Sequence, residues 1–170
     1  YGRSVFEFQR SPSFPWILGS DFSGTVKEVG SKVTKFSEGD EVWGCTAHPN
    51  KGCYAQYGVF NLDEIDFKPL SISFNEAASL PYVALTTWSA LIRWASLRPK
   101  DIKNKKIFIQ AGAGGVGTFA LQLFKSWNCE IATTCSDSNR ALVEELGAKT
   151  VINYSKDDFS TILTYTANGS

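Results

Sequence analysis

Hydrophobic and polar positions follow different patterns in the two halves of the chain. In residues 1–70, short apolar runs are separated by Gly, Pro and Asn, which is typical of strands joined by tight turns. The pattern predicts β-strands at Phe22–Val29, Glu41–Cys45 and Cys53–Phe60. Strands this short indicate a piece of a β-barrel or a β-sandwich.

Helical signals begin in residues 71–104. Ser73 is followed three positions later by Glu76, and such a pair forms a capping box, in which the hydroxyl and the carboxylate bind otherwise unpaired amides at a helix start. Pro81 suits the first turn of a second helix, where its missing N–H removes no intrahelical hydrogen bond. That second helix is predicted over Tyr82–Ala95.

From Lys105 onward, predicted strands alternate with predicted helices. The strands are expected at Ile107–Gln110, Ile131–Cys135 and Thr150–Tyr154. An order of strand and helix repeated in this way requires a parallel sheet with right-handed crossovers. The second half of the chain is therefore predicted to be the first half of a doubly wound nucleotide-binding domain.

Three helices are predicted between and after these strands. The first carries an apolar stripe with the spacing of one helical face, formed by Val116, Phe119, Ala120, Leu123, Phe124 and Trp127. The second covers Arg140–Leu146 and ends before Gly147, because glycine favours the position after a helix. The third is expected over Asp157–Tyr165, with Ser155 as its cap.

Composition and charge exclude several classes of protein. The 170 residues are 43% hydrophobic and 20% charged, and 17 basic residues balance 17 acidic ones. A net charge of zero gives no electrostatic reason to expect nucleic acid or an anionic membrane as a partner. No apolar run approaches the ~20 residues that span a bilayer, and no charged-then-apolar leader precedes the first strand. Because the chain contains no Met, we expect it to begin inside a longer reading frame.

The residues that bind metals most often are few and widely spaced. There is one histidine, His48, and the four cysteines form no C-x-x-C pair. Structural zinc sites need closely spaced ligands, so this spacing argues against one. So few cysteines in a chain of this length also argue against a disulfide framework. We expect free thiols in a reducing compartment.

The sharpest chemical signal is the glycine spacing Gly112-x-Gly114-x-x-Gly117. It follows a predicted strand and opens an amphipathic helix, which is the context of a dinucleotide-binding loop. In that loop Gly112 permits a tight turn, Gly114 lets the backbone approach a pyrophosphate, and Gly117 lets the helix pack close to the strand. The phosphates would bind the free amides at the helix N-terminus. The alternative is a strand–helix turn that binds no ligand.

The residues after the second strand of this region bear on which dinucleotide is bound. An acidic residue there would bind the ribose 2′-hydroxyl of NADH, whereas a small polar residue with a cation would accept the 2′-phosphate of NADPH. Ser136 and Arg140 fit the second pattern. Asp137 lies 20 positions after Gly117, close to the spacing of an NADH carboxylate, but we expect it to lie past the strand and point to solvent. NADPH is favoured, and the alternative for Arg140 is a solvated residue at a helix start.

Three further motifs precede the glycine-rich loop in a fixed order, at Leu18–Gly24, Gly39–Val42 and Ala77–Pro81. Together they resemble the medium-chain dehydrogenase/reductase superfamily, in its zinc-free quinone oxidoreductase branch. The segments Leu80–Thr86 and Gly115–Ala120 are similar to one group in that branch, the reticulon-4-interacting protein 1 group of mitochondrial NADPH oxidoreductases. The likeness covers nearly the whole chain.

This resemblance implies an α/β chain with a GroES-like β-barrel portion at 1–70, connecting helices at 71–104 and the first half of an NADP-binding Rossmann domain at 105–170. It also implies a mitochondrial location and an active site between two lobes. The coenzyme-binding positions that it implies, beyond the three glycines, are Thr86 near the nicotinamide, Ala113, Gly115 and Val116 in the pyrophosphate loop, and Ser136, Arg140 and Tyr154 around the 2′-phosphate. The alternatives are a backbone-bonded hydroxyl for Thr86 and an aromatic ring over the sheet edge for Tyr154.

The chain also departs from the zinc alcohol dehydrogenases of this superfamily. They carry Gly-His-Glu where this chain has Gly19-Ser20-Asp21, and they add a lobe with four close cysteines. The resemblance therefore implies metal-free, NADPH-dependent hydride transfer to a quinone or an α,β-unsaturated carbonyl. No catalytic residue is assigned, because Asp21 is expected to be a buried, hydrogen-bonded carboxylate and Tyr54 a core or strand tyrosine.

Two alternatives concern the function of the chain as a whole. It could be an NADPH-binding regulatory or protein-interaction module without turnover, acting as a homodimer or with a protein partner. We also expect the 170-residue chain by itself not to be catalytically competent, because it carries three of about six Rossmann strands.

Overall fold

The computed structural model describes residues 17–46 and 52–157. Its contacts divide the chain into two compact units, with the boundary between Tyr82 and Val83. This boundary falls inside the segment 71–104 that the sequence assigns to connecting helices. His48 lies outside the described residues, as does the helix expected over Asp157–Tyr165, apart from its first residue.

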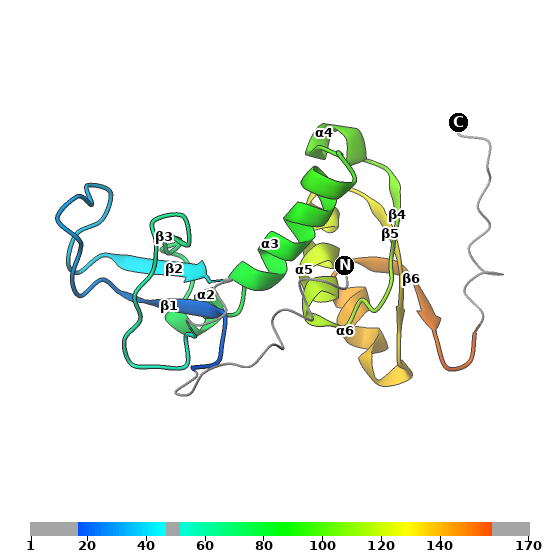
Figure 1. Ribbon diagram of the computed structural model, residues 1–170. Coiled ribbons are helices and arrows are strands. Elements are labelled where there is room, and N and C mark those ends of the chain that lie inside the picture. Colours follow the sequence, from blue (N-terminus) through cyan, green and yellow to red (C-terminus); the bar gives the residue numbers. More distant parts are fainter. Residues whose placement is uncertain (1–16, 47–51, 158–170) are drawn as a thin grey trace. The chain divides into compact units, whose positions relative to one another are not determined.

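The first unit contains a small antiparallel sheet in the order β1-β2-β3 (Figure 1). Its strands are β1 (Asp21–Thr25), β2 (Glu41–Cys45) and β3 (Ile65–Phe67). Asp21 pairs with Cys45 at one end of β1, and Thr25 pairs with Glu41 at the other. The antiparallel sheet agrees with the GroES-like portion that the sequence predicts, and β2 has the predicted bounds.

The other strand predictions for this unit were partly wrong. β1 ends at Thr25 rather than Val29, and the segment predicted as a strand at Cys53–Phe60 is irregular. Within the part of the chain that the structure describes, it makes two strand-like hydrogen bonds, from the amides of Cys53 and Tyr54 to the carbonyls of Gly19 and Leu18. Its aromatic content serves packing instead, because the ring of Phe60 stacks on Phe22 with 3.6 Å between centroids. β3 was not predicted, since three residues are too few to show a period.

The second unit contains a parallel sheet in the order β4-β5-β6. The strands are β4 (Lys106–Ile109), β5 (Glu130–Cys135) and β6 (Ala148–Asn153). The helices that connect them, α5 (Gly115–Ser126) and α6 (Arg140–Glu145), lie on one face of the sheet (Figure 1). This is the arrangement that successive right-handed crossovers produce, so the predicted Rossmann half is confirmed.

Two more helices precede this sheet. α3 (Pro81–Ser89) continues as one π-helical segment (Ala90–Trp94), which matches the predicted second helix, and the short α4 (Pro99–Ile102) was not predicted. Between β5 and α6 lies a 3₁₀ turn (Asp137–Asn139). Gly147 follows α6 with φ of 123°, as expected after a helix end.

The core of the second unit corrects the predicted stripe on α5. The residues of α5 that are buried are Gly117, Ala120, Leu121 and Phe124. Leu121 is fully buried although it lay outside the predicted stripe, whereas Val116 was included and is 39% exposed. The buried face is rotated by one position relative to the predicted stripe. The reason is that Gly117, which a hydrophobicity pattern does not count, is the residue of α5 that approaches the loop backbone most closely.

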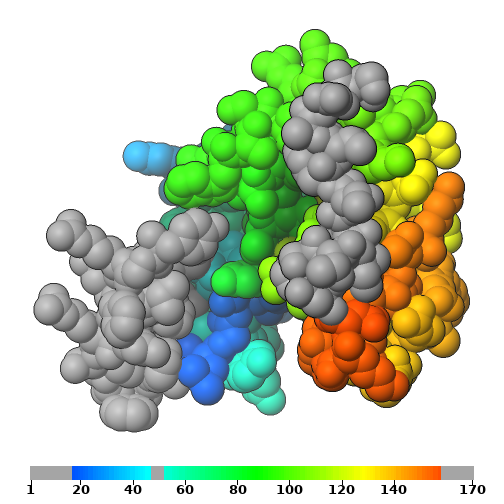
Figure 2. Space-filling model, turned by 90° about the vertical axis from the view of Figure 1, so that its right-hand side faces the viewer, coloured from blue at the N-terminus to red at the C-terminus, as the bar shows by residue number. Residues whose placement is uncertain are grey.

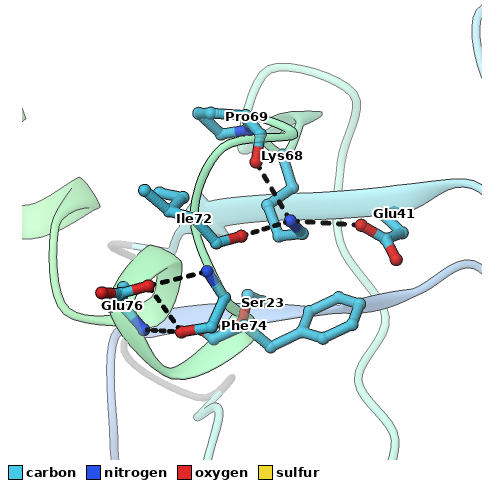
Figure 3. Close-up of polar contacts among 8 residues, drawn as sticks. Ser23, Glu41, Lys68, Pro69, Ile72, Phe74 and Glu76 are labelled. Atoms are coloured by element: carbon cyan, nitrogen blue, oxygen red, sulfur yellow. Dashed lines mark hydrogen bonds and ion pairs between the residues drawn. The ribbon is translucent and has the colours of Figure 1, made fainter.

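A buried lysine fixes the segment between β3 and α2 (Phe74–Ala78). The Lys68 side chain is 4% exposed and pairs with Glu41 of β2 at 3.1 Å. The same ammonium group donates to the carbonyls of Pro69 at 3.0 Å and Ile72 at 2.6 Å (Figure 3). An ammonium group has three donors, so Lys68 has none left for a ligand, and we assign it a structural role.

The capping box predicted at the start of α2 follows directly on this segment. The amide of Ser73 donates to the Glu76 carboxylate at 2.8 Å, and the amide of Glu76 donates to the Ser73 hydroxyl at 3.3 Å. The hydroxyl of Ser23 on β1 donates to the carbonyl of Phe74 at 2.6 Å. These bonds, drawn in part in Figure 3, hold α2 against the first sheet.

We expect Lys68→Met to lower the free energy of unfolding by about 2 kcal/mol, because two partly buried carbonyls and Glu41 lose their donor. Lys27→Met is the matched control, since Lys27 pairs with Glu38 while both side chains are 73% and 69% exposed. That change should alter stability by less than about 1 kcal/mol. Urea unfolding of the complete gene product measures both, and equal losses would contradict the structural role of Lys68.

Candidate functional site

The glycine-rich loop lies at the carboxyl end of β4 and leads into α5. A Cβ at Gly112 would lie 2.1 Å from the Oγ1 of Thr133 on β5. A Cβ at Gly117 would lie 2.3 Å from the carbonyl oxygen of Ala111 and 2.7 Å from the Cα of Gly112. Real Cβ atoms do not approach other atoms this closely, so both positions require glycine.

These distances refine the roles expected for the glycines. Gly112 is required by its close approach to β5, and not by a left-handed backbone conformation. That conformation belongs to Ala111, whose φ is 58°. Gly117 lets α5 pack against the backbone of the loop itself, rather than against β4. A Cβ at Gly114 would meet only the carbonyl oxygen of Ala111, at 3.3 Å, so its outer side stays open to a ligand.

Two threonines of β5 hold the loop, and the sequence analysis did not identify them. The hydroxyl of Thr134 accepts the Ala111 amide at 2.9 Å, and its carbonyl accepts the Gly112 amide at 2.9 Å. The hydroxyl of Thr133 donates to the carbonyl of Ile109 at 2.6 Å. Thr133 and Thr134 are 0% and 3% exposed. Two adjacent hydroxyl residues in the middle of three strands, flanked by the apolar Ile131, Ala132 and Cys135, were the signal that could have revealed them.

The N-terminus of α5 offers amides to an anion. Its cap is Gly114, which has no side chain to accept a hydrogen bond. The first amides of a helix have no intrahelical acceptor, and the helix dipole adds positive potential there. Gly115 and Val116 are exposed, and Ala113 is half-buried. The expected pyrophosphate-loop residues therefore lie together around an open, uncapped helix end, which fits a diphosphate.

Thr86 lies on α3, three positions after Val83, which is the residue of that helix that approaches the loop. A Cβ at Gly115 would come within 3.3 Å of the Val83 Cγ1 atom, and residues three apart on a helix share a face. The Thr86 side chain is exposed, and the backbone hydrogen bond considered for it is made by its neighbour Thr87, whose hydroxyl donates to the Val83 carbonyl at 2.9 Å.

The remaining expected residues lie where β5 and β6 end. Ser136 follows β5, and its hydroxyl lies 2.9 Å from that of Ser138. Arg140 donates to the Val151 carbonyl at 3.2 Å, and its side chain is 43% exposed. Tyr154 follows β6 and is 61% exposed. The carboxyl ends of neighbouring parallel strands meet at one edge of a sheet, so these groups gather at the edge where such folds bind ligands.

Asp137 lies past the end of β5 and is exposed, as expected. Its carboxylate forms an ion pair with Lys156, a residue that the sequence analysis did not consider. The hydrogen bond from Lys156 is the main cause that lowers the pKa of Asp137, and the side chain of Asn153 adds to the effect. The same pair raises the pKa of Lys156. The turn that carries Lys156 lies on the molecular surface, in orange-red in Figure 2.

The first unit contains two side chains that were considered as acid–base groups, Asp21 and Tyr54. Asp21 is half-buried, and its carboxylate accepts the Tyr82 amide at 2.6 Å; burial raises its pKa and this hydrogen bond lowers it, with burial the larger effect. This agrees with a hydrogen-bonded carboxylate. Tyr54 was expected in the core or in a strand, and that expectation was wrong: it is 78% exposed. Its ring lies against Gly19, where an added Cβ would come within 2.4 Å of the Tyr54 Cδ1 atom.

Two cysteines lie near Asp21. The thiol of Cys53 donates to the Ser20 carbonyl at 3.2 Å, and Cys45 is the partner of Asp21 across the strand pair. Burial, reinforced by the negative charges of Asp21 and Glu64, raises the pKa of each thiol to about 11. Thiols of this kind are protonated at neutral pH and are poor nucleophiles.

Residues 17–46 and 52–157 contain neither a cluster of metal ligands nor a membrane-spanning helix. No three His, Cys, Asp or Glu side chains there are grouped so as to hold a metal ion. None of the helices in these ranges has the length and apolarity needed to cross a membrane.

Comparison with known proteins gives relatives for the whole arrangement. Residues 3–81 match the alcohol dehydrogenase GroES-like domain. The chain is 40% identical over 162 residues to the human mitochondrial NAD(P)H oxidoreductase RTN4IP1, a match that covers 91% of this chain and 41% of that protein. The chain thus spans less than half of that relative's length.

Solved structures give the same picture. A quinone oxidoreductase from Coxiella burnetii matches with a TM-score of 0.81 and 37% identity, over 96% of this chain and 50% of that one. A quinone oxidoreductase from Escherichia coli, solved in complex with NADPH, matches with a TM-score of 0.72 and 29% identity, over 90% of this chain and 45% of that one.

The antiparallel GroES-like sheet followed by a parallel sheet with a glycine-rich loop is shared with the solved quinone oxidoreductases, and the comparisons support the likeness to the medium-chain dehydrogenase/reductase superfamily. Within it, the relatives are quinone oxidoreductases and the reticulon-4-interacting protein 1 group, as the sequence motifs indicate. The relatives of that group from human and mouse are named as mitochondrial proteins, in agreement with the location that the resemblance implies.

We expect Gly117→Ala to disrupt the loop, because the added methyl would overlap the carbonyl oxygen of Ala111 at 2.3 Å. Overpacking of this kind should lower stability by about 2 kcal/mol and displace the helix amides. Gly115→Ala is the matched control on the same helix, since its methyl meets only a Val83 side chain at 3.3 Å. Thermal unfolding of both variants measures the difference, and similar melting temperatures would contradict the close approach.

The raised thiol pKa values predict slow alkylation of Cys45 and Cys53. At pH 8 a thiol of pKa about 11 is only about 0.1% thiolate. The rate with iodoacetamide, followed by peptide mass spectrometry, should therefore rise about tenfold per pH unit up to pH 10. In denaturant the same cysteines should react at an ordinary rate. A plateau of the native rate near pH 9 would contradict the burial.

Proposed function

We propose that this chain binds NADPH along the edge formed by the loop after β4 and the ends of β5 and β6. The observation that carries the proposal is the loop, in which Gly112 and Gly117 are required by backbone contacts and α5 begins without a side-chain cap. The amides of Gly114–Val116 would hold the pyrophosphate, with Gly114 leaving room for its close approach.

The adenosine end supports NADPH in particular. Ser136 offers a hydroxyl after β5, Arg140 a partly exposed guanidinium, and Tyr154 an exposed ring after β6. A guanidinium binds phosphate through charge-assisted hydrogen bonds. Asp137, the acid at the spacing for NADH, is already paired with Lys156. Of two relatives, one named an NAD(P)H oxidoreductase supports a nicotinamide coenzyme of either kind, and one solved with NADPH supports NADPH.

We further propose that the protein is a metal-free oxidoreductase that transfers hydride to a quinone or an α,β-unsaturated carbonyl. The bound coenzyme supplies the hydride. The task of this chain is then to fix the coenzyme: the loop holds its phosphates, and Thr86 on α3 offers an exposed hydroxyl toward the nicotinamide end. No proton donor is assigned. The names of the quinone oxidoreductases among the relatives support this class of acceptor.

We expect Arg140→Ala to weaken NADPH binding about tenfold and to leave NADH binding nearly unchanged, because only NADPH carries the 2′-phosphate. Fluorescence titration of the complete gene product measures both affinities, with Trp88 and Trp127 as reporters in the second unit. Arg93→Ala is the matched control, since Arg93 is exposed on the π-helical segment.

Equal loss of both coenzymes in Arg140→Ala would refute the assignment of this residue to the 2′-phosphate. Turnover of a simple quinone with NADPH, insensitive to chelators, would support the oxidoreductase. Tight NADPH binding without turnover of quinones or enones would instead favour the regulatory or protein-interaction module.

A further inference from the structure

We infer that Lys156 is a selectivity-determining residue, which favours NADPH over NADH by masking the carboxylate of Asp137. The inference rests on the proposed coenzyme site and names a determinant that lies outside the residues assigned to it. Lys156 need not touch the coenzyme for this effect. It acts through the acid with which it is paired.

The two residues meet because of the topology of the sheet. Asp137 opens the 3₁₀ turn after β5, and Lys156 lies in the turn after β6. These strands are parallel neighbours, and Cys135 at the end of β5 is in register with Asn153 at the end of β6. Asp137 and Lys156 therefore lie at the same edge of the sheet, two and three positions after the paired residues Cys135 and Asn153. Their ion pair connects the two turns.

The charge of Asp137 poses a physical problem for an NADPH site. The hydrogen bond from Lys156 lowers the pKa of Asp137, so its carboxylate is ionised at neutral pH. It stands two positions past the end of β5, next to the place from which an acid binds the ribose of NADH. A free carboxylate there would repel a phosphate that carries about two negative charges and would accept hydrogen bonds from ribose hydroxyls. Both effects favour NADH.

Lys156 removes this problem. Its ammonium group compensates the charge of Asp137 and occupies a carboxylate oxygen. The charge of Arg140 also lowers the pKa of Asp137, but the contacts of its guanidinium are with Glu144 at 3.5 Å and with the Val151 carbonyl, so Lys156 is the cation paired directly with the Asp137 carboxylate. A further acid, Asp157, faces the pair and accepts the Asn153 amide at 3.0 Å. Three acids and two cations leave the cluster with one excess negative charge, and loss of Lys156 would raise that excess to two.

A purely structural role does not account for the pair. The side chains of Lys156 and Asp137 are 68% and 52% exposed, and exposed pairs contribute little to the stability of a fold. What the pair does control is the local potential at the strand ends, over a distance of about one Debye length.

The test is a double-mutant cycle on the complete gene product, with NADPH and NADH titrated by fluorescence at low and high salt. Lys156→Gln should lower the NADPH/NADH affinity ratio about fivefold at low ionic strength, and the effect should shrink toward about twofold in 0.5 M salt. Asp137→Asn should leave the ratio unchanged or raise it. Lys149→Gln, on the exposed part of β6, is the matched control and should change nothing.

The cycle separates masking from direct contact. If Lys156 acts through Asp137, then Lys156→Gln should have little effect in the Asp137→Asn background, because no carboxylate remains to be masked. An undiminished effect there would mean that Lys156 binds the phosphate itself, and it would overturn the inference.

The outcomes also separate this inference from the proposed function. An unchanged affinity ratio in Lys156→Gln, while Arg140→Ala still loses NADPH, would overturn the role of Lys156 and leave the NADPH site intact. Failure of the wild-type protein to bind either coenzyme would overturn the proposed function, and this inference with it. Unfolding curves that coincide for all variants would confirm that the changes in affinity are local.

Discussion

The contact on which the site depends is between two pieces of backbone. α5 can begin directly after the loop only because Gly117 has no side chain between it and the carbonyl of Ala111. The loop in turn lies against β5 only because Gly112 leaves room for Thr133. A helix end brought this close to a strand end exposes its first amides at the sheet edge, where a diphosphate can reach them. The chemistry of the site thus follows from a steric constraint.

The sequence could predict this loop because its signals are local. Gly112, Gly114 and Gly117 have a fixed spacing, and the strand before them and the helix after them are read from short periodic patterns. The capping box of Ser73 and Glu76 was predictable for the same reason. Local signals failed where a contact from elsewhere decides the structure. The segment Cys53–Phe60 has a strand-like composition, yet it is not part of a sheet. It is held instead by the contact of the Phe60 ring with Phe22.

The same limit applies within the candidate site. Thr133 and Thr134 support the loop from a neighbouring strand, although they lie 22 and 23 positions after Ala111 in the sequence. Lys156 meets Asp137 across two turns that are 19 positions apart. No periodicity relates such positions. Sequence spacing could place Asp137 beyond the strand, but only the sheet topology shows that its charge is compensated. The predicted stripe on α5 differs by one position from the face that is buried, because a hydrophobicity pattern gives no weight to Gly117.

The two ends of the proposed coenzyme site therefore depend on different physics. Backbone contacts fix the phosphate loop, and salt does not screen steric overlap. Exposed charges, namely Arg140, Asp137 and Lys156, shape the adenosine end, and salt screens their interactions. A change in the loop should affect every dinucleotide alike, whereas a change in the charges should redistribute preference among them. Coenzyme selectivity can then vary among relatives of this fold while the loop geometry stays the same.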